Sequence, residues 1–152
     1  MSSANPIMSE PAVLPRVFFD TSVVIAGAFS TTGASYILLQ LAGLTLLDGR
    51  ISPDVRAEAL RNVTAKTPAA LPHLRVLLDT VLVENSCTDA QIEAVTEYAD
   101  PKDVKILAAA VAQRCRYLVT LNEKDFWPPP ALIAVTRPGA LLQMLRAQLA
   151  NL

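Results

Sequence analysis

Short apolar runs alternate along the chain with longer amphipathic segments. Runs rich in β-forming residues predict buried strands at 16–19, 80–84, 117–120 and 132–135, with a shorter one at 50–52. Between them, helical spacing of apolar residues predicts helices at 23–29, 34–47, 53–66, 67–79, 88–98 and 136–149. A further, alanine-rich helix begins at Asp100-Pro101, and Asp48-Gly49 is expected to form a turn.

Strands that alternate with helices predict an α/β protein with a parallel sheet covered on both faces. We therefore expect a three-layer αβα fold of about five parallel strands. The length of 152 residues suits one domain with a sizeable core. The first residues are small, polar and interrupted by prolines, so we expect a flexible arm over 1–15 and the domain over 16–152.

The composition is that of a globular protein. Hydrophobic residues make up 52% of the chain and charged residues 18%, which excludes the intrinsically disordered class. The net charge of −1 and the pI of about 5.8 give no overall basic signal for nucleic-acid binding. Any contact with RNA or DNA must then use a local positive patch, or a metal ion must contribute.

No charged residue occurs between Thr21 and Leu47, so a membrane span has to be considered. The polar segment Ser30–Gly33 divides this stretch, and neither half reaches the ~20 apolar residues that a span needs. No basic segment followed by an apolar stretch opens the chain, so no signal peptide is expected. These features favour a cytoplasmic protein.

Acidic and amide side chains stand where the predicted strands and helices meet. Asp20 ends the first strand, Asn122 and Asp125 follow the fourth, Asp103 lies at the head of the preceding helix, and Glu58 lies inside the helix after the second strand. Ligands of open α/β sheets bind outside the carboxyl ends of the strands, where these residues could converge. Crowded carboxylates repel one another unless a cation joins them, and oxygen ligands suit Mg²⁺ or Mn²⁺.

Each acid also has an ordinary structural interpretation. Asp20 could cap the next helix, Asp103 could interact only with the helix dipole, and Asp125 could close a turn. Glu58 could be a solvated helix residue, and Asp100 is best explained as an N-cap. The combination favours a metal site because these acids and an asparagine fall where one fold would gather them.

Four segments together resemble a known family. They are Phe18-Phe19-Asp20-Thr21-Ser22; Ser52-Pro53-Asp54-Val55-Arg56-Ala57-Glu58; Asp103 followed by the alanine-rich Val104–Ala112; and Leu118-Val119-Thr120-Leu121-Asn122-Glu123-Lys124-Asp125-Phe126. In order and spacing this pattern resembles the PIN-domain nucleases, the family of the VapC-type toxins. The resemblance extends from about residue 16 to 140.

The resemblance implies a metal-dependent endoribonuclease, the toxin of a toxin–antitoxin pair, with Mg²⁺ or Mn²⁺ as cofactor. It also implies the site residues: Asp20, Glu58 and Asp103 as metal ligands and catalytic residues, Asn122 or Asp125 as a further ligand, and Ser22 and Thr120 behind them, orienting a carboxylate or a water. Many relatives carry aspartate at the position of Asn122. Since asparagine is neutral, metal binding should be weaker, and a catalytically weakened interaction or RNA-binding module is the alternative function.

The resemblance also directs attention to partners. Basic residues near the acidic segments are candidates for RNA contact, although each could be an ordinary solvated charge: Arg56, Lys102, Lys105 and Lys124. A small antitoxin protein would cover the site. The apolar excess suggests a homodimer formed through the early helices, the segment Ala34–Leu47 among them.

Two other α/β families fit less well. A haloacid-dehalogenase-type phosphatase needs a second aspartate two residues after the first, and Ser22 occupies that position. A receiver domain needs an acidic phosphorylation site after the third strand and a lysine after the fifth. The chain has Glu84-Asn85-Ser86 and Thr136-Arg137-Pro138 there.

Overall fold

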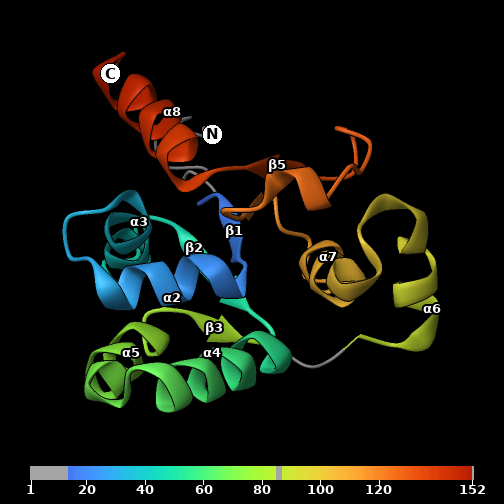
Figure 1. The fold of residues 1–152 in the computed structure, drawn as a ribbon. Coiled ribbons are helices and arrows are strands. Elements are labelled where there is room, and N and C mark those ends of the chain that lie inside the picture. The colour runs from blue at the N-terminus through green and yellow to red at the C-terminus, as the bar shows by residue number, and fades with distance from the viewer. Residues whose placement is uncertain (1–13, 85–86, 152) are drawn as a thin grey trace, which may run out of the picture.

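A parallel five-stranded sheet forms the centre of the protein (Figure 1). The computed structural model describes residues 14–84 and 87–151, so most of the expected arm lies outside the described residues. The strands, all paired in parallel, are β1 (Arg16–Phe19), β2 (Asp48–Ile51), β3 (Leu82–Val83), β4 (Tyr117–Val119) and β5 (Ala134–Thr136). Their order across the sheet is β3-β2-β1-β4-β5.

Helices cover both faces of this sheet. The α-helices are α2 (Thr21–Phe29), α3 (Ala34–Gly43), α4 (Pro53–Lys66), α5 (Leu71–Leu78), α6 (Asp89–Glu93), α7 (Val104–Ala112) and α8 (Pro138–Ala150). Short 3₁₀ turns are η1 (Pro68–Ala70), η2 (Thr96–Tyr98), η3 (Pro101–Asp103) and η4 (Glu123–Asp125). In Figure 1, α2 and α3 lie on one side of β1 and α7 lies on the other. The predicted three-layer αβα fold is confirmed.

The strand order separates this fold from the receiver domain. Receiver domains have the order 2-1-3-4-5, with the third strand next to the first. Here β4 pairs with β1, and β3 lies at the edge beside β2. Glu84, the described residue that follows β3, therefore lies at the edge of the sheet and not at its centre, where a phosphorylation site would have to lie.

Local sequence signals set the start of α4 as predicted. Ser52 is the N-cap, and its Oγ accepts a hydrogen bond from the Val55 N–H at 3.2 Å. Pro53 occupies the first helical position, where its missing N–H has no partner to lose. The helix ends at Lys66, so the predicted range 53–66 is confirmed.

The expected turn at Asp48-Gly49 is wrong, because both residues belong to β2. Position 49 requires glycine because the neighbouring side chains leave no room for a Cβ atom. A Cβ at this position would lie 2.9 Å from the Ala42 side chain and 3.0 Å from those of Phe19 and Val81. Its glycine marks a close approach between β2 and the helical layer, which a sequence pattern cannot distinguish from a turn.

The helix expected over 34–47 is too long, since α3 ends at Gly43. Thr45 adopts a left-handed conformation with φ of 57°, which stops the helix. The segment beyond it leaves Leu44 and Leu46 exposed, at 66% and 59% of their surface. Their apolar character continued the helical pattern without contributing to the core.

Other elements are shorter than predicted or displaced. The strand expected at 80–84 reduces to β3, an edge strand paired only with β2, whose Leu82 and Val83 are exposed. The helix expected at 88–98 divides into α6 and η2. β5 begins two residues later than predicted and α8 begins at Pro138. These are errors of extent, set by pairing and packing rather than by local preference.

The central strands β1 and β4 are almost completely buried. Phe18 pairs in register with Leu118 and Phe19 with Val119, and all four side chains have no exposed surface. The Asp20 N–H continues this ladder by donating to the Val119 carbonyl at 3.0 Å. Both strands thus reach the carboxyl edge of the sheet together.

The membrane question has a direct answer for the described part of the chain. None of its helices is by itself long and apolar enough to cross a membrane. Helices α2 and α3 reach that length and composition only as a pair, with a bend of 98° between them.

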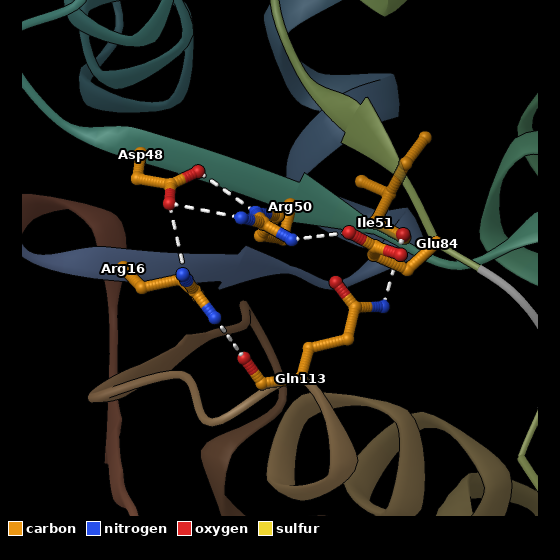
Figure 2. Close-up of polar contacts among 6 residues, drawn as sticks. All are labelled: Arg16, Asp48, Arg50, Ile51, Glu84 and Gln113. Atoms are coloured by element: carbon orange, nitrogen blue, oxygen red, sulfur yellow. Dashed lines mark hydrogen bonds and ion pairs between the residues drawn. The ribbon is translucent and has the colours of Figure 1, made fainter.

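An ionic network joins the strands near their amino ends (Figure 2). The Asp48 carboxylate accepts hydrogen bonds from Arg50 Nε at 2.8 Å, Arg50 Nη2 at 3.1 Å and Arg16 Nε at 3.0 Å. Arg50, only 9% exposed, also pairs with Glu84 beyond β3. Arg16 Nη1 donates to the Gln113 carbonyl at 2.7 Å. Hydrogen bonds from Arg50, and then from Arg16, lower the pKa of Asp48 below its ordinary 3.8.

Replacing Asp48 by asparagine should lower the free energy of unfolding at pH 7 by about 1–3 kcal/mol, because the mostly buried Arg50 loses one of its two charged partners and keeps only Glu84. The pKa of Asp48 is depressed in the folded state. Its stabilisation is therefore present above the unfolded pKa and is lost as the pH falls through the folded value. Urea unfolding of both proteins should show their difference narrowing below pH 4, whereas the exposed Glu93→Gln control stays near wild type. A difference in unfolding free energy between wild type and Asp48→Asn that does not change with pH would contradict this assignment.

Candidate functional site

Asp20 is the buried centre of the candidate site. It follows β1 directly, is 7% exposed, and acts as the N-cap of α2 by accepting the Thr21 N–H at 2.8 Å. Its other oxygen, Oδ2, accepts from Thr120 Oγ1 at 2.7 Å and from Ser22 Oγ at 3.2 Å. Capping alone does not explain the residue, because one carboxylate oxygen is held by two further hydroxyl groups.

Burial raises the pKa of Asp20 above its ordinary value of 3.8. Its hydrogen bonds with Thr120, Ser22 and Thr21 oppose this rise, and the negative charge of Asp103 adds to it. The two carboxylates are therefore close enough to repel each other. A site that holds a second negative charge beside a buried one favours a bound cation.

Asp103 lies at the boundary between η3 and α7. The predicted cap is Asp100, whose Oδ1 accepts the Lys102 N–H at 3.2 Å. Asp103 occupies the N-cap position of α7, although its side chain makes no capping hydrogen bond. Its carboxylate, 18% exposed, instead accepts from Lys102 Nζ at 2.6 Å. The Asp103 carboxylate therefore makes no capping hydrogen bond to the backbone of α7.

The turn after β4 supplies the third carboxylate. Asp125, in η4, accepts from the same Lys102 Nζ at 2.9 Å and is 21% exposed. Its backbone carbonyl accepts the Asp100 N–H at 2.8 Å, which fixes η4 against η3. Two carboxylates from segments 22 residues apart in number (103 and 125) therefore surround one ammonium group.

Asn122 begins the same turn. Its N–H donates to Thr120 Oγ1 at 3.0 Å, so Thr120 connects the turn to Asp20. The side chain of Asn122 is exposed and makes no hydrogen bond to another described residue. Ser22 Oγ similarly accepts the Leu121 N–H at 3.2 Å. The two hydroxyls predicted to stand behind the acids do contact both Asp20 and the turn.

Glu58 is not brought into these contacts. It is exposed on α4 and makes no hydrogen bond or ion pair with any described residue. Within residues 14–84 and 87–151, no three His, Cys, Asp or Glu side chains gather closely enough to hold a metal ion. A role for Glu58 therefore stays a prediction. Asp103 lies close enough to Asp20 for their charges to interact, and it shares the Lys102 ammonium with Asp125.

The candidate RNA-contact residues divide into two kinds. Lys102 is committed to Asp103 and Asp125, which raise its pKa. Arg56, Lys105 and Lys124 are exposed and form no ion pair within the described residues. Because all four basic residues lie near the acids in sequence, the sequence predicted RNA contact for each of them equally. Only the fold shows that Lys102 is the one that pairs with Asp103 and Asp125.

Arg137 was missed by sequence reasoning. It is the N-cap of α8, and its Nη1 donates to the Leu121 carbonyl at 3.2 Å, beside the acidic turn. The signal in the sequence was an arginine before the proline that starts the helix, with no acid in the first turn. Nothing local linked that segment to the turn after β4, because the contact depends on β5 pairing with β4.

The fold and the site define an α/β protein with an acidic cluster at the carboxyl edge of its sheet. The family model for the PIN domain matches residues 16–124. This range includes four of the five candidate acidic and amide site residues and ends one residue before the fifth, Asp125. The chain therefore belongs to the PIN-domain family, a family of nucleases. None of the curated proteins compared with the chain matches it.

Solved structures share the fold. The VapBC2 structure from Rickettsia felis, bound to a promoter DNA fragment, has a TM-score of 0.60 and 19% identity over 80% of this chain and 98% of that chain. The DNA-bound VapBC from Salmonella typhimurium has a TM-score of 0.63 and 16% identity, over 82% of this chain and 99% of that chain. A toxin–antitoxin complex from Klebsiella pneumoniae has a TM-score of 0.59 and 28% identity, over 80% of this chain and 97% of that chain.

Proposed function

We propose that the protein is a metal-dependent endoribonuclease that hydrolyses RNA phosphodiester bonds as the toxin of a toxin–antitoxin pair. The observation that carries this proposal is the position of Asp103, whose charge interacts with the buried Asp20 and whose carboxylate shares Lys102 with Asp125. Membership of the PIN-domain family supports hydrolysis of nucleic acid. Similarity in fold to a structure described as a toxin–antitoxin complex, and to two described as VapBC bound to DNA, supports the biological role.

The chemistry of the donors fits Mg²⁺ or Mn²⁺. All candidate ligands are hard oxygens, which these ions prefer over nitrogen or sulfur. Lys102 already places one cation between Asp103 and Asp125, and Asp20 is raised in pKa partly by the charge of Asp103. We propose that Asp20 and Asp103 hold the ion, with Asp125, Glu58 and Asn122 contributing through side-chain movement or water.

When bound, the ion lowers the pKa of a coordinated water and stabilises negative charge on the scissile phosphate. The chain itself supplies orientation. Thr120 and Ser22 both donate to one oxygen of Asp20, and these two hydrogen bonds hold its carboxylate in a single orientation. The ammonium of Lys102, which pairs with Asp103 and Asp125, would be in position to contact a phosphate oxygen of the RNA if a bound cation took its place beside these carboxylates. The exposed Arg56, Lys105 and Lys124 would extend that contact along the strand.

Addition of Mg²⁺ or Mn²⁺ at millimolar concentration should raise the melting temperature of the wild-type protein by about 2–8 °C, because the ion binds only the folded site. Asp20→Asn and Asp103→Asn should abolish this rise and reduce cleavage of single-stranded RNA on the order of 100-fold. The control Asp89→Asn, exposed on α6, keeps both properties. Wild type that shows neither a shift nor metal-dependent cleavage would falsify the proposal and favour a weakened interaction module.

Removal of the Lys102 charge should tighten metal binding. Its ammonium competes with the ion for two carboxylates, and exposed ion pairs of this kind are weak, so Lys102→Gln should lower the dissociation constant on the order of threefold. Lys105→Gln removes the same charge from the exposed face of α7 and serves as the matched control. Calorimetric titration with Mn²⁺ measures both. Equal affinities for the two variants would show that Lys102 does not occupy the metal position.

We further propose a homodimer and an antitoxin partner. Leu44 and Leu46, beyond the end of α3, expose most of their surface, which supports association through this part of the early helical segment. Light scattering at micromolar protein should give about twice the monomer mass of 16.3 kDa. A monomer mass would refute the dimer, and replacement of both leucines by serine should convert the dimer to that mass.

A further inference from the structure

A hollow of about 400 Å³ lies beside the acidic site, where the amino-terminal ends of α3 and α8 come together. Its wall includes Gly33 and Ser35 from the start of α3, Arg137 and Gly139 from the start of α8, and Leu121 from the turn after β4. The hollow thus shares a wall with the turn that carries Asn122 and Asp125. A separate cavity of about 580 Å³ lies at the amino ends of β1 and β2, away from the acids.

The backbone around this hollow offers hydrogen-bond donors without acceptors. Gly33 and Arg137 are the N-caps of the two helices, and neither gives a side-chain cap. No acidic residue lies in the first turn of either helix. The N–H groups of Ser35, Gly139 and Ala140 have no partner among the described residues. Two helix dipoles and several free amides therefore face one space, an arrangement that favours an anion.

Side chains in the same wall give independent support. Ser35 as a residue is only 6% exposed, and its hydroxyl makes no hydrogen bond to any described residue, so this hydroxyl is available to a group in the hollow. Arg137 is the single charged residue of the lining. One of its guanidinium N–H groups donates to the Leu121 carbonyl, which leaves the others for a ligand. No carboxylate of the lining opposes them.

The hollow is joined to the acidic site by a continuous chain of hydrogen bonds. Arg137 donates to the Leu121 carbonyl, the Leu121 N–H donates to Ser22 Oγ, and Ser22 Oγ donates to Asp20 Oδ2. A group bound in the hollow is therefore held at a fixed position relative to the carboxylates. Successive phosphates of one nucleic-acid strand can then occupy the acidic site and the hollow.

We propose that this hollow binds a backbone phosphate of the RNA substrate next to the scissile one, with Ser35, Arg137 and the first amides of α3 and α8 as donors. This inference rests on the proposed nuclease function. It assigns substrate binding to a neutral-to-positive hollow beside the acids, and it accounts for RNA binding by a protein with a net charge of −1.

The test uses the full chain in EDTA, so that RNA is bound and not cleaved. Gly139→Asp places a carboxylate at the start of α8, where the helix dipole favours it, and a Cβ at Gly139 meets no atom within 4 Å, so the variant should fold. Gly139→Asn is its neutral, isosteric control. Arg137→Gln removes the pocket charge, and Arg146→Gln removes an exposed charge farther along α8. Binding of a fluorescent single-stranded RNA octamer is measured by anisotropy over a range of salt.

Gly139→Asp and Arg137→Gln should weaken RNA binding on the order of fivefold and reduce the salt dependence by about one released ion, while Gly139→Asn and Arg146→Gln stay near wild type. Equal affinities for all four variants overturn the inference. Inorganic phosphate is titrated separately, and saturable phosphate binding that RNA fails to displace would overturn the RNA assignment. Because no step needs metal or cleavage, these outcomes are independent of the metal-dependent melting and cleavage that test the proposed function.

Discussion

The hydrogen bond from Thr120 Oγ1 to Asp20 Oδ2 joins the ends of the two central strands, and the candidate site is arranged around it. Asp20 is buried because β1 enters the core with no exposed surface at Phe18 or Phe19. A buried carboxylate is unfavourable unless donors surround it, and Thr120 is available only because β4 lies beside β1 in register. The same hydroxyl accepts the Asn122 N–H, so the acidic turn is fixed by the strand pairing.

Electrostatic repulsion is the second constraint on this edge of the sheet. The charge of Asp103 interacts with the buried Asp20, and Lys102 from the same chain neutralises Asp103 together with Asp125. The side chain of Lys102 is largely exposed, so its ion pairs are weak and their loss would cost little free energy. This internal counter-ion reduces the repulsion between the carboxylates of Asp103 and Asp125.

Charge also changes sign over a short distance beside the acids. The acidic cluster suits a metal ion, whereas the hollow between α3 and α8 presents amides and Arg137. A polyanion that crosses both would meet a cation in the first and hydrogen-bond donors in the second. Such local alternation allows contact with nucleic acid without an overall positive charge, which this chain does not have.

The sequence alone determined the α/β class, the strand β1, the start of α4 and the positions of Asp20 and Asp103, because these depend on local spacing, capping and burial. It could not determine the length of β3, the end of α3 or the place of Gly49, which depend on neighbouring layers. Tertiary structure alone decided that Lys102 faces the acids, that Glu58 stays outside their contacts, and that Arg137 reaches the turn after β4. The physical reason is that local signals describe one element at a time, whereas these contacts join elements brought together by the order of strands in the sheet.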